Sequence, residues 1–472
     1  MATKLTFAVW SSVLIPVGSA WLHAATLDAT TVIGSGTKAA IPLQGGTQSV
    51  SYDNDAPAGY YWADRLGDEM AVAVTPGGLD MGAYSLTTTF STSSGENILL
   101  DLNGGNISAT SGSISSAGTN YSGSIYIYNV GDISLVNGGF STLNTRLATQ
   151  TRDAGHLQIG TNDAPAGNVQ VASVICGRLG IGTRGTITFY GAGNVMITNQ
   201  AGQVGPFIMN GAPPSAGKGA MDVKVFHRGG FKAGLCGIDN APVSGSTDKH
   251  QILFNGWFGG TGSPAGGFSA TQIVSRAENS HTTNARNIPA ADLSVINYAS
   301  VNVAPGGIET YTSRTATGVR NYGTAGNITI TNIVNDIEIA GDIDAHSDDT
   351  DNPVGSRGIL NLQAGGDITV NSLNLSNVQY AAFSPGGDAF IQSALANFVT
   401  TGTGAGTEAD PVVTAQTALR VTTNKVIYYV ADANAYLGGK TYRLAAPSGT
   451  AGGGGLLKLS SLGQTGTLIL IR

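Results

Sequence analysis

Short runs in which apolar and polar residues alternate recur along most of the chain. Each run starts with glycine, continues with a small polar residue and an aliphatic residue, and then alternates. Such a run is long enough for a short β-strand with one buried face, and glycine with Asn or Asp suits the corner before it. The runs begin at Gly105, Gly123, Gly131, Gly167, Gly185, Gly193, Gly326, Gly341 and Gly366.

The spacing of these runs predicts stacked coils. Gly123, Gly185, Gly326 and Gly366 lie 62, 141 and 40 residues apart, which is close to multiples of about 20. Two or three short strands per period are typical of a parallel β-solenoid, in which each coil buries its apolar face against the next. We therefore expect an all-β protein whose residues 96–383 form a right-handed parallel β-helix of about 15 coils.

The alternative fold is an array of β-sandwiches. Sandwiches show antiparallel hairpins every ~8–12 residues, with Asn-Gly or Asp-Gly turns between matched strands. Asn-Gly occurs at Asn103, Asn137, Asn210 and Asn255, but none of the four separates two alternating runs of matched length. The pattern therefore favours the solenoid.

The N-terminal part of the chain differs from the repeating body. Residues 1–20 hold a lysine, a 13-residue apolar run and a small-residue cleavage site, as a secretion signal does; cleavage as late as residue 25 is the alternative. Residues 26–95 include the densest aromatic and charged stretch, at 60–70. We expect these residues to form the first strands and a cap over the open strand edges.

The C-terminal part also departs from the repeat. Residues 384–415 are rich in Gly, Thr and Ala and predict an irregular linker, with one short helix at 388–398. Residues 416–472 contain further strand candidates separated by glycine-rich turns. This segment predicts a small C-terminal β-unit.

Composition narrows the function classes. Of the 472 residues, 68 are glycine and 11% are charged, and the net charge is −7. This acidic balance argues against a general nucleic-acid binder, which needs a basic surface to displace counterions. After removal of the signal no apolar run is long enough to cross a membrane. An extracellular or cell-surface location follows from the signal.

Several segments resemble the coils of known secreted proteins. The segments Ala325–Ile330 and Gly365–Asn371 are similar in composition and style to the coils of secreted bacterial β-helix surface proteins, of the filamentous-haemagglutinin and autotransporter-passenger type. The resemblance covers residues 100–380. It implies a β-helical adhesin, although the chain lacks the Asn-Pro-Asn-Gly type motif of two-partner secretion and a C-terminal strand series for a membrane barrel.

One segment is unusually acidic. Seven carboxylates occur within sixteen residues that contain no lysine or arginine. Ile337, Ile339 and Ile343 alternate with them, so the even-numbered acids are expected on the outward face. Oxygen ligands in this number suit Ca²⁺; a solvated acidic face and a catalytic carboxylate pair are the alternatives. The candidate metal ligands are Asp336, Glu338, Asp342, Asp344, Asp348, Asp349 and Asp351.

The two cysteines do not form a disulfide framework. Cys176 and Cys236 are 60 residues apart, which at three coils places them about 14 Å apart along the rod. A disulfide needs Cα atoms within about 7 Å, so two buried thiols are expected rather than a bridge.

These observations predict a secreted structural or adhesive surface protein that presents a β-helical rod to glycans, to surfaces or to other copies of itself. We assign no catalytic or cofactor-binding residue, and Ca²⁺ is the one ion considered. Two alternatives stay open. One is a β-helical carbohydrate-active enzyme, either a polysaccharide lyase or a hydrolase. The other is a self-assembling matrix or filament subunit, since open strand edges can template pairing.

Overall fold

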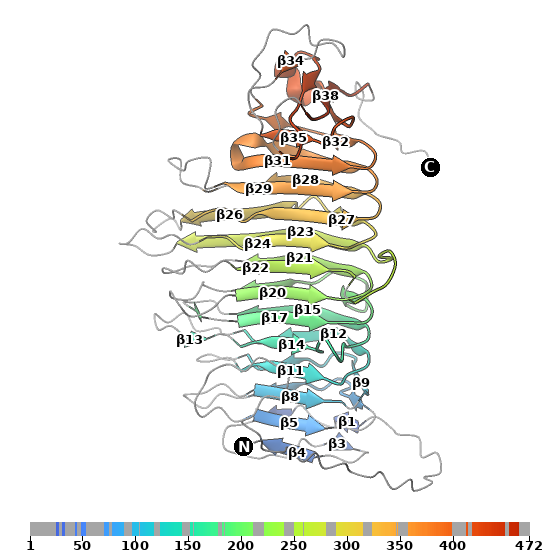
Figure 1. The fold of residues 1–472 in the computed structure, drawn as a ribbon. Coiled ribbons are helices and arrows are strands. Elements are labelled where there is room, and N and C mark those ends of the chain that lie inside the picture. The colour runs from blue at the N-terminus through green and yellow to red at the C-terminus, as the bar shows by residue number, and fades with distance from the viewer. Residues whose placement is uncertain are drawn as a thin grey trace, which may run out of the picture.

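The computed structural model is an elongated stack of short strands that lie across its long axis, with strands from the N-terminal part of the chain at one end and strands from the C-terminal part at the other (Figure 1). No helix in the described part of the chain is long and apolar enough to cross a bilayer. The secretion signal predicted at 1–20 lies outside the described residues. The structure describes residues 25–27, 31–33, 43–44, 49–52, 70–74, 78–88, 97–102, 104–117, 123–143, 152–153, 155–177, 182–183, 185–210, 221–239, 250–257, 259–279, 289–314, 323–345, 347, 357–398, 412–413, 418–448 and 453–461.

The described residues form two long sheets. Sheet 1 has 13 described strands: β4 (Ser49–Tyr52), β5 (Met70–Val74), β8 (Asn97–Asp101), β11 (Ile125–Tyr128), β14 (Leu157–Ile159), β17 (Gly185–Tyr190), β20 (Met221–Phe226), β22 (Gln251–Asn255), β24 (Asp292–Ile296), β27 (Ile328–Ile333), β29 (Gly358–Ala364), β31 (Val378–Pro385) and β35 (Leu419–Val421).

Sheet 2 has 23 described strands: β1 (Ala25–Leu27), β2 (Thr31–Ile33), β3 (Leu43–Gln44), β6 (Gly78–Asp80), β7 (Leu86–Thr88), β9 (Asn106–Ala109), β10 (Ile114–Ser115), β12 (Ile133–Ser141), β15 (Val169–Gly177), β18 (Val195–Ile197), β19 (Phe207–Asn210), β21 (Phe231–Asp239), β23 (Phe268–Asn279), β25 (Val301–Val303), β26 (Ile308–Arg314), β28 (Ile337–Asp344), β30 (Ile368–Asn374), β32 (Ala389–Ile391), β33 (Leu395–Ala396), β34 (Val412–Val413), β36 (Val426–Tyr429), β37 (Tyr442–Arg443) and β38 (Leu456–Leu459). The remaining described elements are β13 (Arg152–Asp153), β16 (Gly182–Thr183) and the 3₁₀ segments η2 (Leu375–Asn377) and η3 (Asp432–Leu437).

Sheet 2 contains two parallel ladders side by side. Ladder A runs from β1 through β6, β9, β12, β15, β18, β21, β23, β25, β28, β30, β32 and β36 to β38. Ladder B runs from β2 through β7, β10, β12, β15, β19, β21, β23, β26, β28 and β30 to β33. The chain passes from sheet 1 to ladder A, then to ladder B, and back to sheet 1. We call one such passage a coil.

Parallel pairing dominates the described residues, and the antiparallel strand pairs lie near the ends of the stack. They are β1 with β3, β4 with β5, and β37 with β38. The antiparallel β-sandwich alternative does not fit this pattern, because parallel neighbours need a long crossover rather than a hairpin. The observed arrangement is consistent with the stacked coils of a β-solenoid.

The length of one coil differs from the predicted period of about 20 residues. In sheet 1, Leu360 pairs with Ala381, 21 residues later, whereas Ile252 pairs with Leu293, 41 residues later. Most coils carry turn segments of varying length between their strands. The predicted period was therefore wrong, because the short strands repeat while the turns between them do not.

The predicted helix at 388–398 was also wrong. These residues form β32 and β33, which continue ladders A and B by pairing with β30. In addition, β36 pairs in parallel with β32, so the strands after residue 416 extend the same sheet. In residues 388–398, pairing with the preceding strand and burial of alternate side chains outweighed the local helix propensity.

Buried side chains at matching positions form the core. Ile133 of β12 pairs with Ile107 and Val169 of the neighbouring strands, and all three are almost completely buried. The same column continues through Val195, Phe231, Phe268, Val301, Ile337, Ile368, Ala389, Ile427 and Leu457. The aliphatic or aromatic residue of each glycine-initiated run therefore points inward, as the alternation predicted.

The polar residue that precedes this column joins each coil to the next. The Asn106 side chain accepts a hydrogen bond from the backbone N–H of Asp132 at 2.8 Å. Asp132 does the same for Asn168 at 2.6 Å, and Asn168 for Asn194 at 3.0 Å. Asn194 accepts from Gly230 at 2.7 Å. We call this row of side chains the Asx ladder; Asp336 and Asp367 repeat it nearer the C-terminus.

The Asx ladder explains four of the signature glycines, Gly131, Gly167, Gly193 and Gly366. A Cβ atom at Gly193 would lie 2.4 Å from Asn168 Oδ1, and one at Gly167 would lie 2.2 Å from Asp132 Oδ1. Replacing Gly193 with alanine is therefore expected to displace the Asn168 side chain and to lower the free energy of unfolding by about 1–3 kcal/mol. Chemical denaturation measures the loss. Gly191→Ala is the control, because the backbone of Gly191 is not left-handed and an added Cβ there would lie no closer than 3.5 Å to another atom. Equal losses at the two glycines would contradict the steric explanation.

Candidate functional site

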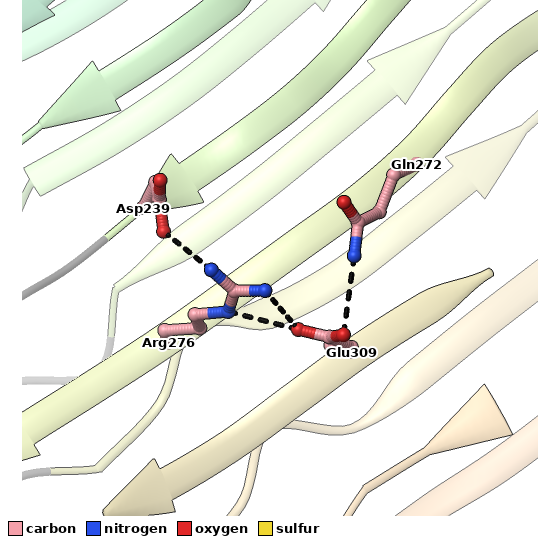
Figure 2. Close-up of polar contacts among 4 residues, drawn as sticks. All are labelled: Asp239, Gln272, Arg276 and Glu309. Carbon is pink, nitrogen blue, oxygen red and sulfur yellow. Dashed lines mark hydrogen bonds and ion pairs between the residues drawn. The ribbon is translucent and has the colours of Figure 1, made fainter. Parts of the chain in front are cut away.

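The most extensive described cluster of charged side chains lies on ladder B. Figure 2 shows Arg276 of β23 between Asp239 at the end of β21 and Glu309 of β26, with Gln272 of β23 beside Glu309. Asp239 is opposite Arg276 because β21 and β23 pair in register up to the neighbouring residues. We call these four residues the Arg276 cluster.

The guanidinium of Arg276 binds both carboxylates. Its Nη1 donates to Asp239 Oδ1 at 3.0 Å, and its Nε donates to Glu309 Oε2 at 2.8 Å. A further contact joins Nη2 to the same Glu309 oxygen, and Gln272 Nε2 donates to Glu309 Oε1 at 3.1 Å. The cluster thus holds three successive coils together by charge-assisted hydrogen bonds.

The carboxylates determine the electrostatics of Arg276. Burial alone would lower the pKa of Arg276, but the hydrogen bond and charge of Glu309, with Asp239 and Tyr311, outweigh burial and raise it. The guanidinium also lies 5.9 Å from the centre of the Tyr311 ring. The arginine therefore stays charged and serves as a fixed clamp on two acids.

Removing this clamp is expected to destabilise the fold modestly. The Arg276 and Glu309 side chains are 30% and 27% exposed, so solvent screens the pair and Arg276→Gln is expected to cost about 1–2 kcal/mol. Unfolding in denaturant at low and at about 1 M salt measures it, and the difference from wild type should shrink as salt increases. Arg276→Lys keeps the charge but loses the two-pronged geometry, so an intermediate loss is expected. Unchanged stability of Arg276→Gln at low salt would contradict the clamp.

The acidic segment predicted from the sequence adjoins this cluster. Ile337, Ile339 and Ile343 are buried, whereas Asp336, Glu338 and Asp342 are exposed and Asp344 is half-buried. The even-numbered acids therefore share the outward face, as the alternation predicted. In addition, Asp344 is the Cα partner of Glu309. Asp348, Asp349 and Asp351 lie outside the described residues.

The four described acids accept hydrogen bonds from neighbouring coils. Asp336 accepts from the backbone of Asp367 at 2.8 Å. Glu338, Asp342 and Asp344 each accept from an asparagine side chain at 3.2 Å, namely Asn302, Asn371 and Asn377. No three His, Cys, Asp or Glu side chains among the described residues are grouped to hold a metal ion. The Ca²⁺ site stays a prediction, because three of its seven ligands are not described.

A buried histidine–tyrosine pair, His227 and Tyr298, lies inside the stack. His227 is completely buried, its Nε2 lies 2.8 Å from the Tyr298 hydroxyl, and its Nδ1 accepts from the Gly229 N–H at 3.3 Å. This pattern places the imidazole proton on Nε2. Burial lowers the pKa of His227 to about 4, so the ring is neutral at physiological pH. His227 directly follows β20, and its ring centre lies 5.5 Å from that of Tyr298.

The two cysteines are buried and unbridged. They lie on β15 and β21, with β19 as the one strand between them. The predicted separation of three coils was therefore too large, because a coil here exceeds 20 residues. Burial raises the pKa of the Cys176 thiol to about 11 and raises that of Cys236 further. Both thiols are thus protonated and unreactive at neutral pH.

The Arg276 cluster was not predicted from the sequence. Its hydrogen-bonded pairs are 33 to 37 positions apart in the sequence, and only the true coil length would have aligned them. Comparisons with protein-family models, with curated proteins and with solved structures found no match.

Proposed function

We propose that this chain is a right-handed parallel β-helix that serves as a secreted structural and adhesive surface protein. The parallel ladders and the repeated passage through sheet 1, ladder A and ladder B support the β-helix. The right hand follows from the general preference of parallel strand crossovers. The secreted location follows from the apolar N-terminal segment of the sequence.

One observation carries the structural part of the proposal: the described outward side chains repeatedly join coil to coil. The Asx ladder and the Arg276 cluster do so with hydrogen bonds. Stacked aromatic pairs do so as well, with ring centres 5.1 Å apart for Tyr190 and Phe226 and 5.4 Å apart for Phe390 and Tyr428. Such axial contacts stiffen a rod, which suits a spacer or a presenting surface more than a catalytic cleft.

The outward face of ladder A is the surface proposed for adhesion. Lys232, Ser269, Asn302 and Glu338 occupy successive partner positions, and Lys232, Asn302 and Glu338 are exposed. Amide, hydroxyl and charged groups at the spacing of about 4.8 Å between strands match the hydroxyl groups of an extended polysaccharide. We propose an extracellular glycan as the partner.

A binding and cleavage assay tests this function. The purified chain is screened against a panel of polysaccharides for retention and for release of reducing or unsaturated sugars, with and without millimolar Ca²⁺. We expect retention without cleavage. The double variant Lys232→Ala/Asn302→Ala should weaken binding about tenfold, while Lys440→Ala, an exposed lysine on another part of the chain, should not.

Three other outcomes would overturn the proposal. Sugar release would identify a polysaccharide lyase or hydrolase. Filaments in sedimentation and negative-stain images would identify an assembly subunit. Retention that is unchanged in the double variant would exclude the face of ladder A as the adhesive surface.

A further inference from the structure

The C-terminal end of ladder B is closed by side chains rather than by another strand. The last strand of this ladder in the described chain is β33, which pairs with β30. On the side facing β30, the carbonyl of Ala394 accepts a hydrogen bond from Leu373 at 2.8 Å. The groups on the opposite edge are the Ser393 carbonyl and the N–H and carbonyl of Leu395. An open edge of this kind is a template for another strand.

Asn434 of η3 occupies two of these three groups. Its Oδ1 accepts from the Leu395 N–H at 2.7 Å, and its Nδ2 donates to the Ser393 carbonyl at 2.9 Å. In a parallel ladder, an incoming residue donates to one carbonyl and accepts from the N–H two residues further on. The side-chain amide therefore reproduces the pairing of one residue of a parallel strand.

The rest of η3 holds this amide in place. Asn434 is completely buried, and its Nδ2 also donates to the Val430 carbonyl at 2.9 Å. Its backbone is non-helical, with φ −133° and ψ 39°. The third edge group, the Leu395 carbonyl, accepts from the Tyr436 hydroxyl, and the neighbouring Leu437 is buried. All three edge groups thus have a partner that is not a strand.

We propose that η3 terminates ladder B and that it prevents a second copy of this chain from adding a strand to β33. The partner excluded is another copy, because the ladder B strands of this chain already pair with one another in parallel register. The inference goes beyond the proposed adhesive function and does not depend on it. If η3 caps β33 in this way, the rod stays a single molecule and does not grow by end-to-end stacking.

Side-chain variants of the full chain test the proposal. Asn434→Ala combined with Tyr436→Phe leaves all three edge groups without their partners. The control is Asn424→Gly, which changes an exposed asparagine with a left-handed backbone, φ 64°, that glycine adopts readily. Sedimentation velocity over a range of concentrations gives the assembly state. Hydrogen exchange gives the protection of the Leu395 amide.

We expect the wild type and Asn424→Gly to stay single with a protected Leu395 amide. The double variant should form dimers or longer species as its concentration rises, and its Leu395 amide should exchange faster at low concentration. A folded double variant that stays single although the amide exchanges faster would overturn the proposal. The proposal would also be overturned if the wild type assembled and its Leu395 amide in β33 then exchanged more slowly. If circular dichroism shows that the double variant is unfolded, the single variant Tyr436→Phe replaces it, because it frees the Leu395 carbonyl alone. A Tyr436→Phe variant that associates no more than the wild type would contradict the proposal that η3 terminates ladder B.

Discussion

Replacing Phe231 with alanine is expected to lower the free energy of unfolding by about 3–5 kcal/mol. Phe231 lies at the centre of a buried aromatic group. Its ring centre is 4.8 Å from that of Phe254, 5.1 Å from that of Phe268 and 5.6 Å from that of Phe207. These neighbours come from three other strands, so a cavity at this position loosens several coils at once.

Equilibrium unfolding in denaturant measures this loss. The adjacent Lys232 is exposed, and Lys232→Ala is expected to change the stability by less than about 0.5 kcal/mol. Phe231→Leu should fall between the two, because it keeps most of the buried apolar volume. A loss below about 1 kcal/mol for Phe231→Ala would mean that the aromatic group does not form a packed core.

Acid is expected to destabilise the protein through His227. The unfolded chain takes up a proton at this residue near the ordinary pKa of 6.5, whereas burial delays uptake in the folded chain to a pKa of about 4. The neutral His227 ring therefore makes its full contribution to the free energy of unfolding above pH 6.5, and this contribution is lost as the pH falls through 4. The full loss is about 3 kcal/mol.

The comparison with His227→Gln isolates this contribution. Glutamine retains an N–H donor for the Tyr298 hydroxyl but does not titrate. The stability difference between wild type and variant should therefore narrow or reverse between pH 6.5 and 4. Acid effects from carboxylates are common to both chains and cancel in the difference. A difference that stays constant over this range would show that His227 is not protonated during acid unfolding.

The local alternation of apolar and polar residues predicted much of the fold. Because side chains of a strand point alternately to its two faces, the runs after Gly131 and Gly193 predicted which residues are buried, and Ile133 and Val195 are buried as expected. The same alternation placed Glu338 and Asp342 on the outward face. The period was wrong, and with it the separation of the cysteines, because turn length is free to vary between strands of constant register.

The amino-acid sequence by itself determined the all-β class, the short strands and the inward face of each. These properties depend on residues within a few positions of one another. The tertiary structure alone decided which distant side chains meet: the carboxylates that Arg276 joins, the amide of Asn434 on the edge of β33, and the Asn or Asp side chains against Gly131, Gly167, Gly193 and Gly366. Those contacts connect residues in different coils, and their alignment depends on the summed lengths of all the turns between them. No local pattern encodes that sum.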